Sequence, residues 1–390
     1  MKVNRTFRCY PSACQERSLA KTFGCVRVAY NDALTLKEDN YKAGKKLQYK
    51  DLSKALTDSK KTKERAYLKD ASSVPLQQSL RHLETAYQNF FQKRSARPGY
   101  KVKRGRQSAE YTMAAFKFKA GQLSIAKIGR LDVRWSYPLE SQPTTVTVLK
   151  DASGRYFVTL TLEETKAPLP ETGKEVGIDL GINTLAMFSD GTKIENPRWS
   201  NTHKEKLAKL QQTLSRRVKG SGRYERLRTK VARLHAHIAD SRKDFLNKLT
   251  TDIVRKYDVI AIEDLSVKGM LKCHNIARAI ADIGMFAFRR MLTYKCLWYG
   301  KELRLASRWA PTSKTCNTCG VKYAELKRNE RTWTCAHCGT THDRDLNAAK
   351  NILAVGQTVT ARGACVKPKR TSVLGRSGRR NVNQPALVSP

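Results

Sequence analysis

The sequence predicts a multidomain α+β protein, in which strands and amphipathic helices are followed by an α/β second half. Three observations support this fold class. Apolar stripes at helical spacing lie between residues 15 and 93, short β-branched runs lie between Tyr111 and Glu163, and buried-strand patterns begin at Val176. The pattern changes at about Glu171. With 390 residues, 40% of them hydrophobic, the chain is long enough for two or three domains with their own cores.

Residues 1–10 are predicted to form a short basic strand, which two helices follow. The helices cover residues 15–37 and 75–93, and the second has Pro75 in its first turn. We expect both apolar stripes to be core; they consist of Leu19, Phe23, Val26, Tyr30 and Ala33, and of Leu76, Leu80, Leu83, Tyr87 and Phe90. Cations between them could track phosphates: Lys45, Lys46, Lys50, Lys54, Lys60, Lys61, Lys63 and Arg65.

After a basic connection at 94–106, broken by Gly and Pro, the pattern becomes β. Short β-branched runs are separated by Gly, Pro and Ser at 123–128, 131–135, 144–149 and 156–162. The strand at 1–10 could pair with them and make a small barrel that the helices interrupt. Ala167–Lys174, with two prolines, is predicted to be a linker.

The second half opens with two strand patterns, Val176–Gly181 and Leu185–Ser189. A strand carrying an Asp and then an adjacent hairpin strand is typical of the start of an RNase H-type sheet. Later, Asp258–Glu263 is predicted to be a buried strand between helices at 245–257 and 284–299. The basic tail after Cys365 contains no acids, and we expect it to be disordered.

A basic helical hairpin is predicted at residues 204–243, with a break at Gly220–Gly222. It holds 13 Lys or Arg against three acids. A solvated charged face is one interpretation, but the excess of cations favours contact with a nucleic-acid backbone.

The whole chain is strongly basic, with 75 Lys and Arg, 34 Asp and Glu and a formal charge of +41. Such a charge repels itself unless a polyanion neutralises it, and nucleic acid is the natural partner. Charge alone fits a basic coat protein equally well. No apolar run approaches the ~20 residues that span a bilayer, and Met1–Phe7 lacks a signal-peptide core. We therefore expect an intracellular protein, whose ten cysteines are thiols or metal ligands.

Three acids interrupt or border apolar segments. Asp179 lies within a predicted buried strand, Glu263 ends another, and Asp345 precedes an Ala-rich helical segment. Burying an unpaired carboxylate costs several kcal/mol. Phosphodiester cleavage by two cations roughly 3.5–4 Å apart needs several carboxylates, which suit Mg²⁺. We infer that the three acids converge, although Asp345 could instead be a helix N-cap and Asp343 a turn acid.

Four cysteines form the pattern C-x₂-C-x₁₅-C-x₂-C: Cys316, Cys319, Cys335 and Cys338. This spacing is a strong signal for structural zinc with four thiolates; an iron–sulfur cluster is the minor alternative. Gly320 and Gly339 follow the two pairs, as tight knuckle turns require. His337 and His342 are surplus to four cysteines and are not expected to be ligands.

Taken in order, these motifs resemble the split RuvC domain of the TnpB family, transposon-encoded relatives of compact CRISPR effectors. The motifs are Gly177–Gly181, Ile262–Leu265, the cysteine pairs and Asp343–Ala349. The segments Phe23–Asn31 and Leu83–Phe91 are similar to the family's recognition-lobe helices. The resemblance extends over the chain up to the tail. Arg97–Lys101 departs from the family's Phe-Pro-x-Phe-Lys-like element, which puts local guide-RNA or wedge contacts in doubt.

The resemblance implies an N-terminal wedge β-barrel with an inserted helical recognition lobe, and a C-terminal RuvC/RNase H-like domain with an inserted zinc ribbon. The implied bounds are 1–14 and 104–167 for the wedge, 15–103 for the recognition lobe, 172–312 and 341–365 for the nuclease domain, 313–340 for the ribbon, and 366–390 for a disordered basic tail.

The family's activity is RNA-guided cleavage of DNA, with a guide RNA from the transposon end and a short flanking motif read by the protein. Carried over by motif, Asp179, Glu263 and Asp345 are the catalytic ligands of Mg²⁺ or Mn²⁺, with two ions expected, and the four cysteines bind one structural Zn²⁺. Nucleic-acid contacts are predicted for Tyr49 and Gln77, which resemble readers of the flanking motif, and for the hairpin residues Arg216, Arg217, Lys219 and Arg223. A prokaryotic cytoplasmic location at the nucleoid follows.

Two other functions share this fold. A catalytically inactive relative would be an RNA-guided repressor, which the intact acid trio argues against. An RNase H-type core can also perform DNA strand transfer, as a transposase does. A plain coat protein would leave the acids and the cysteine motif without a purpose.

Overall fold

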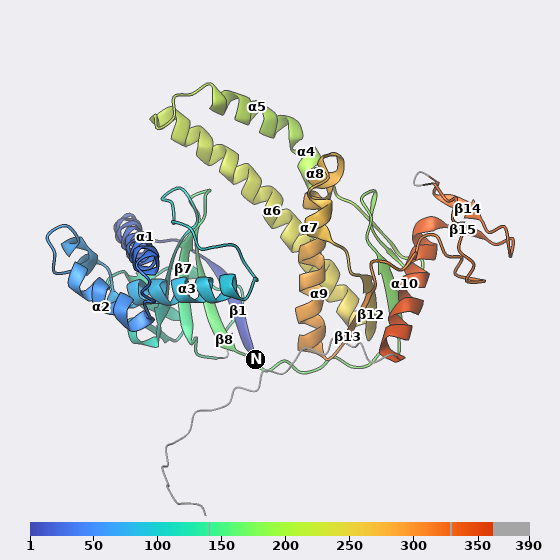
Figure 1. Cartoon of the computed structure of the whole chain (residues 1–390), viewed down its shortest axis with the longest axis horizontal. Coiled ribbons are helices and arrows are strands. Elements are labelled where there is room, and N and C mark those ends of the chain that lie inside the picture. Colours follow the sequence, from blue (N-terminus) through green and yellow to red (C-terminus); the bar gives the residue numbers. More distant parts are fainter. Residues whose placement is uncertain (140, 328–329, 362–390) are drawn as a thin grey trace, which may run out of the picture. The chain divides into compact units, whose positions relative to one another are not determined.

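The computed structural model describes residues 1–139, 141–327 and 330–361, and its contacts divide the chain into two compact units (Figure 1). The first unit combines Met1–Lys166 with Trp199–Lys243, and the second combines Ala167–Arg198 with the chain from Asp244 onward. The predicted linker therefore starts where the first unit's N-terminal segment ends. The tail predicted at 366–390 lies outside the described residues.

The first unit is built on a five-stranded sheet with the order β2-β7-β8-β1-β6. The N-terminal strand β1 pairs antiparallel with β8 along its whole length, from Lys2 opposite Glu163 to Cys9 opposite Tyr156. The predicted pairing of residues 1–10 with the later strands is thus confirmed. The strand bounds are β1 Lys2–Cys9, β2 Gln107–Thr112, β6 Val133–Arg134, β7 Thr145–Lys150 and β8 Tyr156–Glu163, with a separate sheet of β3 Phe116–Lys119, β4 Gln122–Ile125 and β5 Gly129–Leu131.

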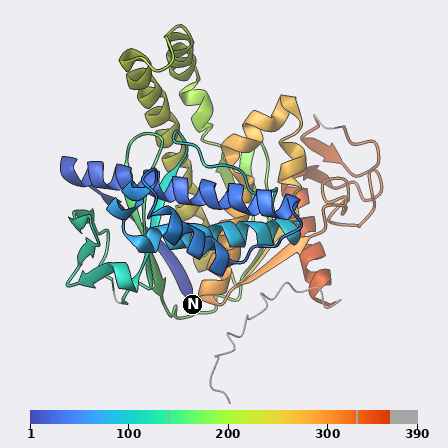
Figure 2. The same ribbon diagram turned by 60° about the vertical axis from the view of Figure 1, so that its left-hand side comes forward.

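Helices from residues 13–91 share one hydrophobic core with this sheet. They are α1 Ala13–Lys42, α2 Tyr49–Ser59, the 3₁₀ helix η1 Ala66–Asp70 and α3 Ser73–Phe91, and the long α1 and α3 run across the front of the view in Figure 2. Ser12 and Gln15 close a capping box at the start of α1. Helix α2 was not predicted, because only Leu52 and Leu56 of its 11 residues are buried.

The apolar stripe of α3 is core over only part of its length. Leu76, Leu80 and Leu83 are fully buried, as predicted. Tyr87 is partly buried and packs against the same core. Phe90 is only partly buried, so the prediction that the whole stripe is core is wrong for the last turn of the helix.

The basic hairpin consists of α4 Trp199–Thr202, α5 Lys204–Ser215 and α6 Gly222–Lys256, and its predicted break is confirmed. Residues up to Lys243 group with the first unit. Arg155, in the turn just before β8, links the sheet to the hairpin by pairing with Asp240 of α6 as well as with Asp151. Among the described residues, no helix is long and apolar enough to cross a membrane.

The second unit contains a five-stranded sheet with the order β11-β10-β9-β12-β13. Strand β9 pairs antiparallel with β10 and parallel with β12, which in turn is parallel to β13, so the predicted hairpin opening and parallel partner are confirmed. The bounds are β9 Glu175–Asp179, β10 Thr184–Phe188, β11 Lys193–Glu195, β12 Val259–Glu263, β13 Glu302–Ala306, α7 Val267–Met270, α8 His274–Ile283, α9 Met285–Tyr299 and α10 Arg344–Ala361, with a two-stranded ribbon of β14 Thr332–Thr334 and β15 Thr341–Asp343.

Helix α10 lies against β9, and a missing side chain makes this approach possible. A Cβ atom added at Gly177 would lie 2.1 Å from the carbonyl oxygen of Ala349 and 2.7 Å from the backbone nitrogen of Leu353. Farther along the helix, a Cβ at Gly356 would lie 2.8 Å from that of Ala261 on β12. Gly177 is therefore a position of close backbone approach.

We predict that Gly177→Ala destabilises the second unit by at least about 3 kcal/mol, because its Cβ meets backbone atoms that cannot rotate away. Thermal unfolding measures this as a lowered Tm. The matched control is Gly24→Ala within α1, where an added Cβ has nothing within 4 Å. That variant should hold or raise the Tm, since Ala is the better helix former. Equal effects of the two substitutions would contradict the close-packing account.

Candidate active site

The acids Asp179 and Glu263 end neighbouring parallel strands. Ile178 of β9 stands opposite Ile262 of β12, so the next residue of each strand emerges at the same sheet edge. Asp345, the second residue of α10, joins them from a distant part of the sequence. All three line one pocket of about 450 Å³. The structure thus brings together the three acids that sequence reasoning had grouped.

The carboxylates of Glu263 and Asp345 oppose the ionisation of Asp179. Burial raises the pKa of Asp179 to about 7, and the negative charges of Glu263 and Asp345 act in the same direction. Burial also raises the pKa of Glu263, while a hydrogen bond that Thr312 Oγ1 donates to its Oε1, at 3.4 Å, acts in the opposite direction. A bound cation would relieve the repulsion between carboxylates that are held close together, so the pocket has the electrostatics of a metal site.

The two acids at the start of α10 do different things. Asp343 Oδ1 accepts a hydrogen bond from the backbone N–H of Leu346 at 2.9 Å, as an N-cap does. Asp345 instead lines the pocket, and Arg331 contacts its two carboxylate oxygens at 3.1 and 3.3 Å. The capping role that sequence analysis weighed for Asp345 therefore belongs to Asp343.

The four motif cysteines form one cluster, with all their sulfur atoms within 4.8 Å of one another. Cys316 and Cys338 lie 3.6 Å apart at sulfur, as do Cys319 and Cys335. Tetrahedral coordination with Zn–S bonds of about 2.3 Å requires sulfur atoms about 3.8 Å apart. The cluster therefore fits a metal ion with four thiolate ligands.

Both knuckle turns close as the sequence predicted. The N–H of Gly320 donates to the carbonyl of Cys316, and that of Gly339 to the carbonyl of Cys335, each at 2.9 Å. Both glycines have positive φ, at 76° and 70°. The buried His342 places Nε2 3.0 Å from the Cys316 sulfur, so it contacts the cluster from outside the set of four.

Two asparagines of α10 tie the cysteine segment to the pocket. Asn347, which is 1% exposed, donates to the carbonyl of Thr315 at 2.8 Å and accepts from the N–H of Asn317 at 2.9 Å. One turn later, Asn351 donates to the carbonyls of Thr312 and Thr315 at 2.7 and 2.6 Å. Sequence analysis missed both roles, although an Asn pair at i, i+4 in an Ala-rich helix was a visible signal.

A second contact network lies beside Glu263. Its neighbour Asp264 pairs with Arg289 of α9 and with Arg308, which follows β13. Hydrogen bonds from Arg308 and Arg289 lower the pKa of Asp264. Sequence analysis did not single out these residues, because their partners are distant in the sequence. They fix the segment that leads from β13 to Thr312.

The predicted nucleic-acid contacts lie on the first unit. Tyr49 is half-buried, with the Arg81 guanidinium 4.8 Å from its ring centroid, and Gln77 is exposed one turn before Arg81 on α3. In the hairpin, Arg217 and Arg223 line a small pocket with Arg226 and Lys230. The remaining two predicted cations, Arg216 and Lys219, are exposed in the turn between α5 and α6.

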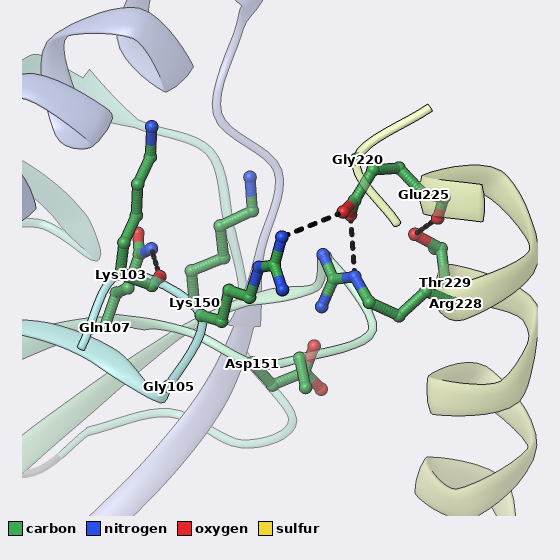
Figure 3. A pocket seen from close by; sticks show the side chains of 12 residues that line it. Lys103, Gly105, Gln107, Lys150, Asp151, Gly220, Glu225, Arg228 and Thr229 are labelled. Atoms are coloured by element: carbon green, nitrogen blue, oxygen red, sulfur yellow. Dashed lines mark hydrogen bonds and ion pairs between the residues drawn. The ribbon is translucent and has the colours of Figure 1, made fainter. Parts of the chain in front are cut away.

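A larger basic pocket of about 520 Å³ lies within the same unit, between the 103–107 segment, the β7–β8 turn and the start of α6 (Figure 3). Arg228 donates to Glu225 at 2.6 Å, and Arg104 lies 3.9 Å from the same carboxylate. Lys103 and Lys150 add two further positive charges to the lining. Sequence analysis placed these residues in separate domains and did not group them.

Comparison with known families gives three matches along the chain. Residues 156–274 match a family described as "Probable transposase", and residues 286–352 match the Cas12f1-like TNB domain. Residues 1–46 match a family described as a helix-turn-helix domain, although in this structure they contain strand β1 and the single long helix α1.

Individual relatives match nearly the whole chain. A protein of Streptomyces pristinaespiralis named "Putative RNA-guided DNA endonuclease" is 49% identical over 98% of this chain and 96% of its own length. The Escherichia coli K12 protein "Putative RNA-guided DNA endonuclease InsQ" is 35% identical over 93% and 94%. A cryo-EM structure of a Cas12f1–sgRNA–target DNA complex has a similar fold, with a TM-score of 0.50 and 13% identity over 90% of this chain and 98% of that one. The chain therefore belongs to the TnpB family of RNA-guided DNA endonucleases.

Proposed function

We propose that this chain is a transposon-encoded, RNA-guided DNA endonuclease that hydrolyses phosphodiester bonds with two metal ions. The observation that supports this most directly is the pocket that Asp179, Glu263 and Asp345 share, where burial and the charges of the other two acids raise the pKa of Asp179. The names of the full-length relatives support the RNA guide and the DNA target. Such a protein would act in the prokaryotic cytoplasm, at the nucleoid.

The three carboxylates would hold Mg²⁺ or Mn²⁺, which supplies a water of lowered pKa and stabilises the leaving oxygen. Thr312 orients Glu263 through its hydroxyl hydrogen bond. Arg331 and Arg344 also line the pocket, where their positive charges would attract the scissile phosphate. In this arrangement Arg331 holds Asp345, so DNA binding would exchange that contact for one with the phosphate.

We assign the remaining parts by the family resemblance. The sheets of the first unit correspond to the wedge barrel and its helices α1 to α3 to the recognition lobe. The basic hairpin and the second unit correspond to the RuvC-like nuclease. The cysteine cluster would hold one structural Zn²⁺. An inactive repressor and a strand-transfer transposase are the alternative functions. The first would leave target DNA uncut, and the second would join it.

We predict that Asp345→Ala lowers plasmid cleavage by at least about 10³-fold, because it removes a metal ligand. Asp343→Ala is the matched control two residues away. It should retain most of the cleavage while costing about 1 kcal/mol of stability, as the loss of a helix cap does. The assay uses the complex with its copurified RNA and a plasmid library of targets, followed by gel analysis of the ends.

Equal losses for the two variants would contradict the assignment of Asp345. Target binding without cleavage by the native protein would favour the repressor. Joined rather than cut DNA would favour the transposase.

We predict that Mn²⁺ binding strengthens as the pH rises. Because the pKa of Asp179 lies at about 7, its carboxyl is protonated below that pH, and an incoming cation must displace the proton. The apparent affinity should therefore rise by about tenfold per pH unit from pH 5.5 to 7 and level off above it. Isothermal titration calorimetry of the RNA-free protein measures it, and a flat profile over this range would argue against Asp179 as a ligand.

We predict one zinc ion per chain, retained by Asn347→Ala but lost by Cys338→Ser. Both variants should cleave more slowly, because the asparagine joins the cluster to the helix that carries Asp345. Cys273→Ser, at an exposed cysteine outside the cluster, is the control and should keep both metal and activity. Metal analysis by mass spectrometry with parallel cleavage assays measures both effects. Full activity after zinc loss would contradict the coupling.

A further inference from the structure

Exposed aromatic side chains gather where α3 runs beyond its core. Phe91, the last residue of α3, is 68% exposed, and Tyr41, near the end of α1, is 65% exposed. Phe90 and Tyr87 lie beside them and are only partly buried. Large exposed apolar side chains that cluster in this way mark a binding surface, whereas isolated ones do not.

These aromatic residues line a groove of about 700 Å³, the volume of a typical ligand site. The end of α1, the 43–47 loop and the last turns of α3 form its walls. The Tyr87 and Phe91 rings stack at 6.0 Å with 26° between their planes, and Phe90 is tilted against Phe91 at 5.4 Å. The three rings therefore form a stepped aromatic surface, on which Phe91 is the most exposed side chain.

Positive charges surround the aromatic surface. Lys37 places its ammonium 5.1 Å from the Tyr87 ring centroid. The acid in the lining is Glu38, which pairs with Arg97 at 2.9 Å. The five cations of the lining are Lys37, Lys42, Lys45, Lys46 and Arg97. An apolar partner would leave most of these charges uncompensated, so the groove fits a polyanion that also carries flat apolar rings.

We propose that this groove binds an unpaired, single-stranded segment of RNA, with bases stacked on Phe91 and Tyr41 and phosphates paired with the surrounding lysines. Aromatic faces and a cationic groove are the combination that holds single strands. An RNA that stays bound between successive targets would keep the aromatic side chains covered, whereas target DNA would leave them exposed. The identity of this RNA as the guide rests on the proposed function.

The groove is separate from the predicted readers of the flanking motif. Gln77 lies near the start of α3 and Phe91 ends the helix, about 21 Å away along the axis at 1.5 Å per residue. Tyr49 contacts Arg81, between these two positions. One helix would thus present two surfaces, one at each end.

Photocrosslinking locates the bound base. Full-length protein, freed of copurified RNA at high salt, is irradiated with a twelve-nucleotide oligouridine that contains 5-iodouridine, and the modified peptides are identified by mass spectrometry. We expect crosslinks at Tyr41, Phe90 or Phe91, reduced at least tenfold by Phe91→Ala. Crosslinks confined to other peptides, such as those of the hairpin, would overturn the proposal.

Affinity measurements then separate stacking from charge. Phe91→Ala and Tyr41→Ala should each weaken binding of the oligouridine by roughly tenfold, whereas Tyr67→Ala, at an aromatic residue 44% exposed outside the groove, should not. Lys45→Gln with Lys46→Gln should reduce the slope of log K against log salt by about 1.4. The control, Lys117→Gln with Lys119→Gln on β3, removes the same charge and should leave the groove crosslink intact.

Two competitors test the occupant. Polyglutamate carries charge without bases, and its displacement of the groove crosslink at equal charge would point to an acidic protein instead. Preferential crosslinking of the deoxyuridine oligomer would point to DNA. Asp345→Ala should crosslink as the native protein does. If the native protein crosslinks at the groove but does not cleave its target, only the proposed function is contradicted. If the native protein cleaves its target but gives no crosslink at the groove, only the proposal for the groove is contradicted.

Discussion

The close approach of α10 to β9 is the constraint on which the pocket depends. Gly177 has no side chain, and the carbonyl of Ala349 and the N–H of Leu353 occupy the space that a Cβ would fill. The same helix carries Asp345 in its first turn, and Gly177 lies two residues before Asp179. Backbone contact between helix and strand therefore sets the separation of two acids that lie far apart in the sequence.

Helix α10 also fixes the cysteine cluster. Asn347 and Asn351 hold the backbone carbonyls of Thr312 and Thr315 just before the first knuckle, and Thr312 in turn donates to Glu263. The carboxylates and the thiolates are thus connected by a short path of hydrogen bonds through one helix. A structural change at either site would therefore be transmitted to the other through these hydrogen bonds.

Much of this arrangement could be predicted from the sequence, for a physical reason. An acid in an apolar strand is costly unless it has a purpose, so Asp179 and Glu263 stood out, and thiolate spacing identified the cysteine cluster. The choice between Asp343 and Asp345 was harder, because it depends on which residue caps α10 and hence on where the helix begins. The resemblance favoured Asp345, and the cap geometry supports that choice with a contact that no sequence pattern displays.

Other features depended on tertiary contacts that periodicity does not encode. The stripe of α3 has helical spacing to its end, but full burial stops after Leu83, and Tyr87 and Phe90 are only partly buried. Strand β13, with residues only partly buried up to Ala306, lacked a strong strand pattern. The hairpin's grouping with the first unit arises through contacts such as Arg155 with Asp240. In each case the deciding partner lies far away in the sequence.

The charge distribution gives the pocket its chemistry. Against a formal charge of +41, burial disfavours the ionised forms of Asp179 and Glu263, and the neighbouring charges of Glu263 and Asp345 disfavour that of Asp179 further. Such a cluster destabilises the fold unless a bound cation offsets the repulsion between the carboxylates, and perturbed pKa values of this kind are typical of functional sites. The most direct test is anomalous scattering from crystals soaked in Mn²⁺. Peaks within about 2.0–2.5 Å of carboxylate oxygens of Asp179, Glu263 and Asp345 are the predicted result, and peaks at none of these acids, or at only one of them, would contradict the account.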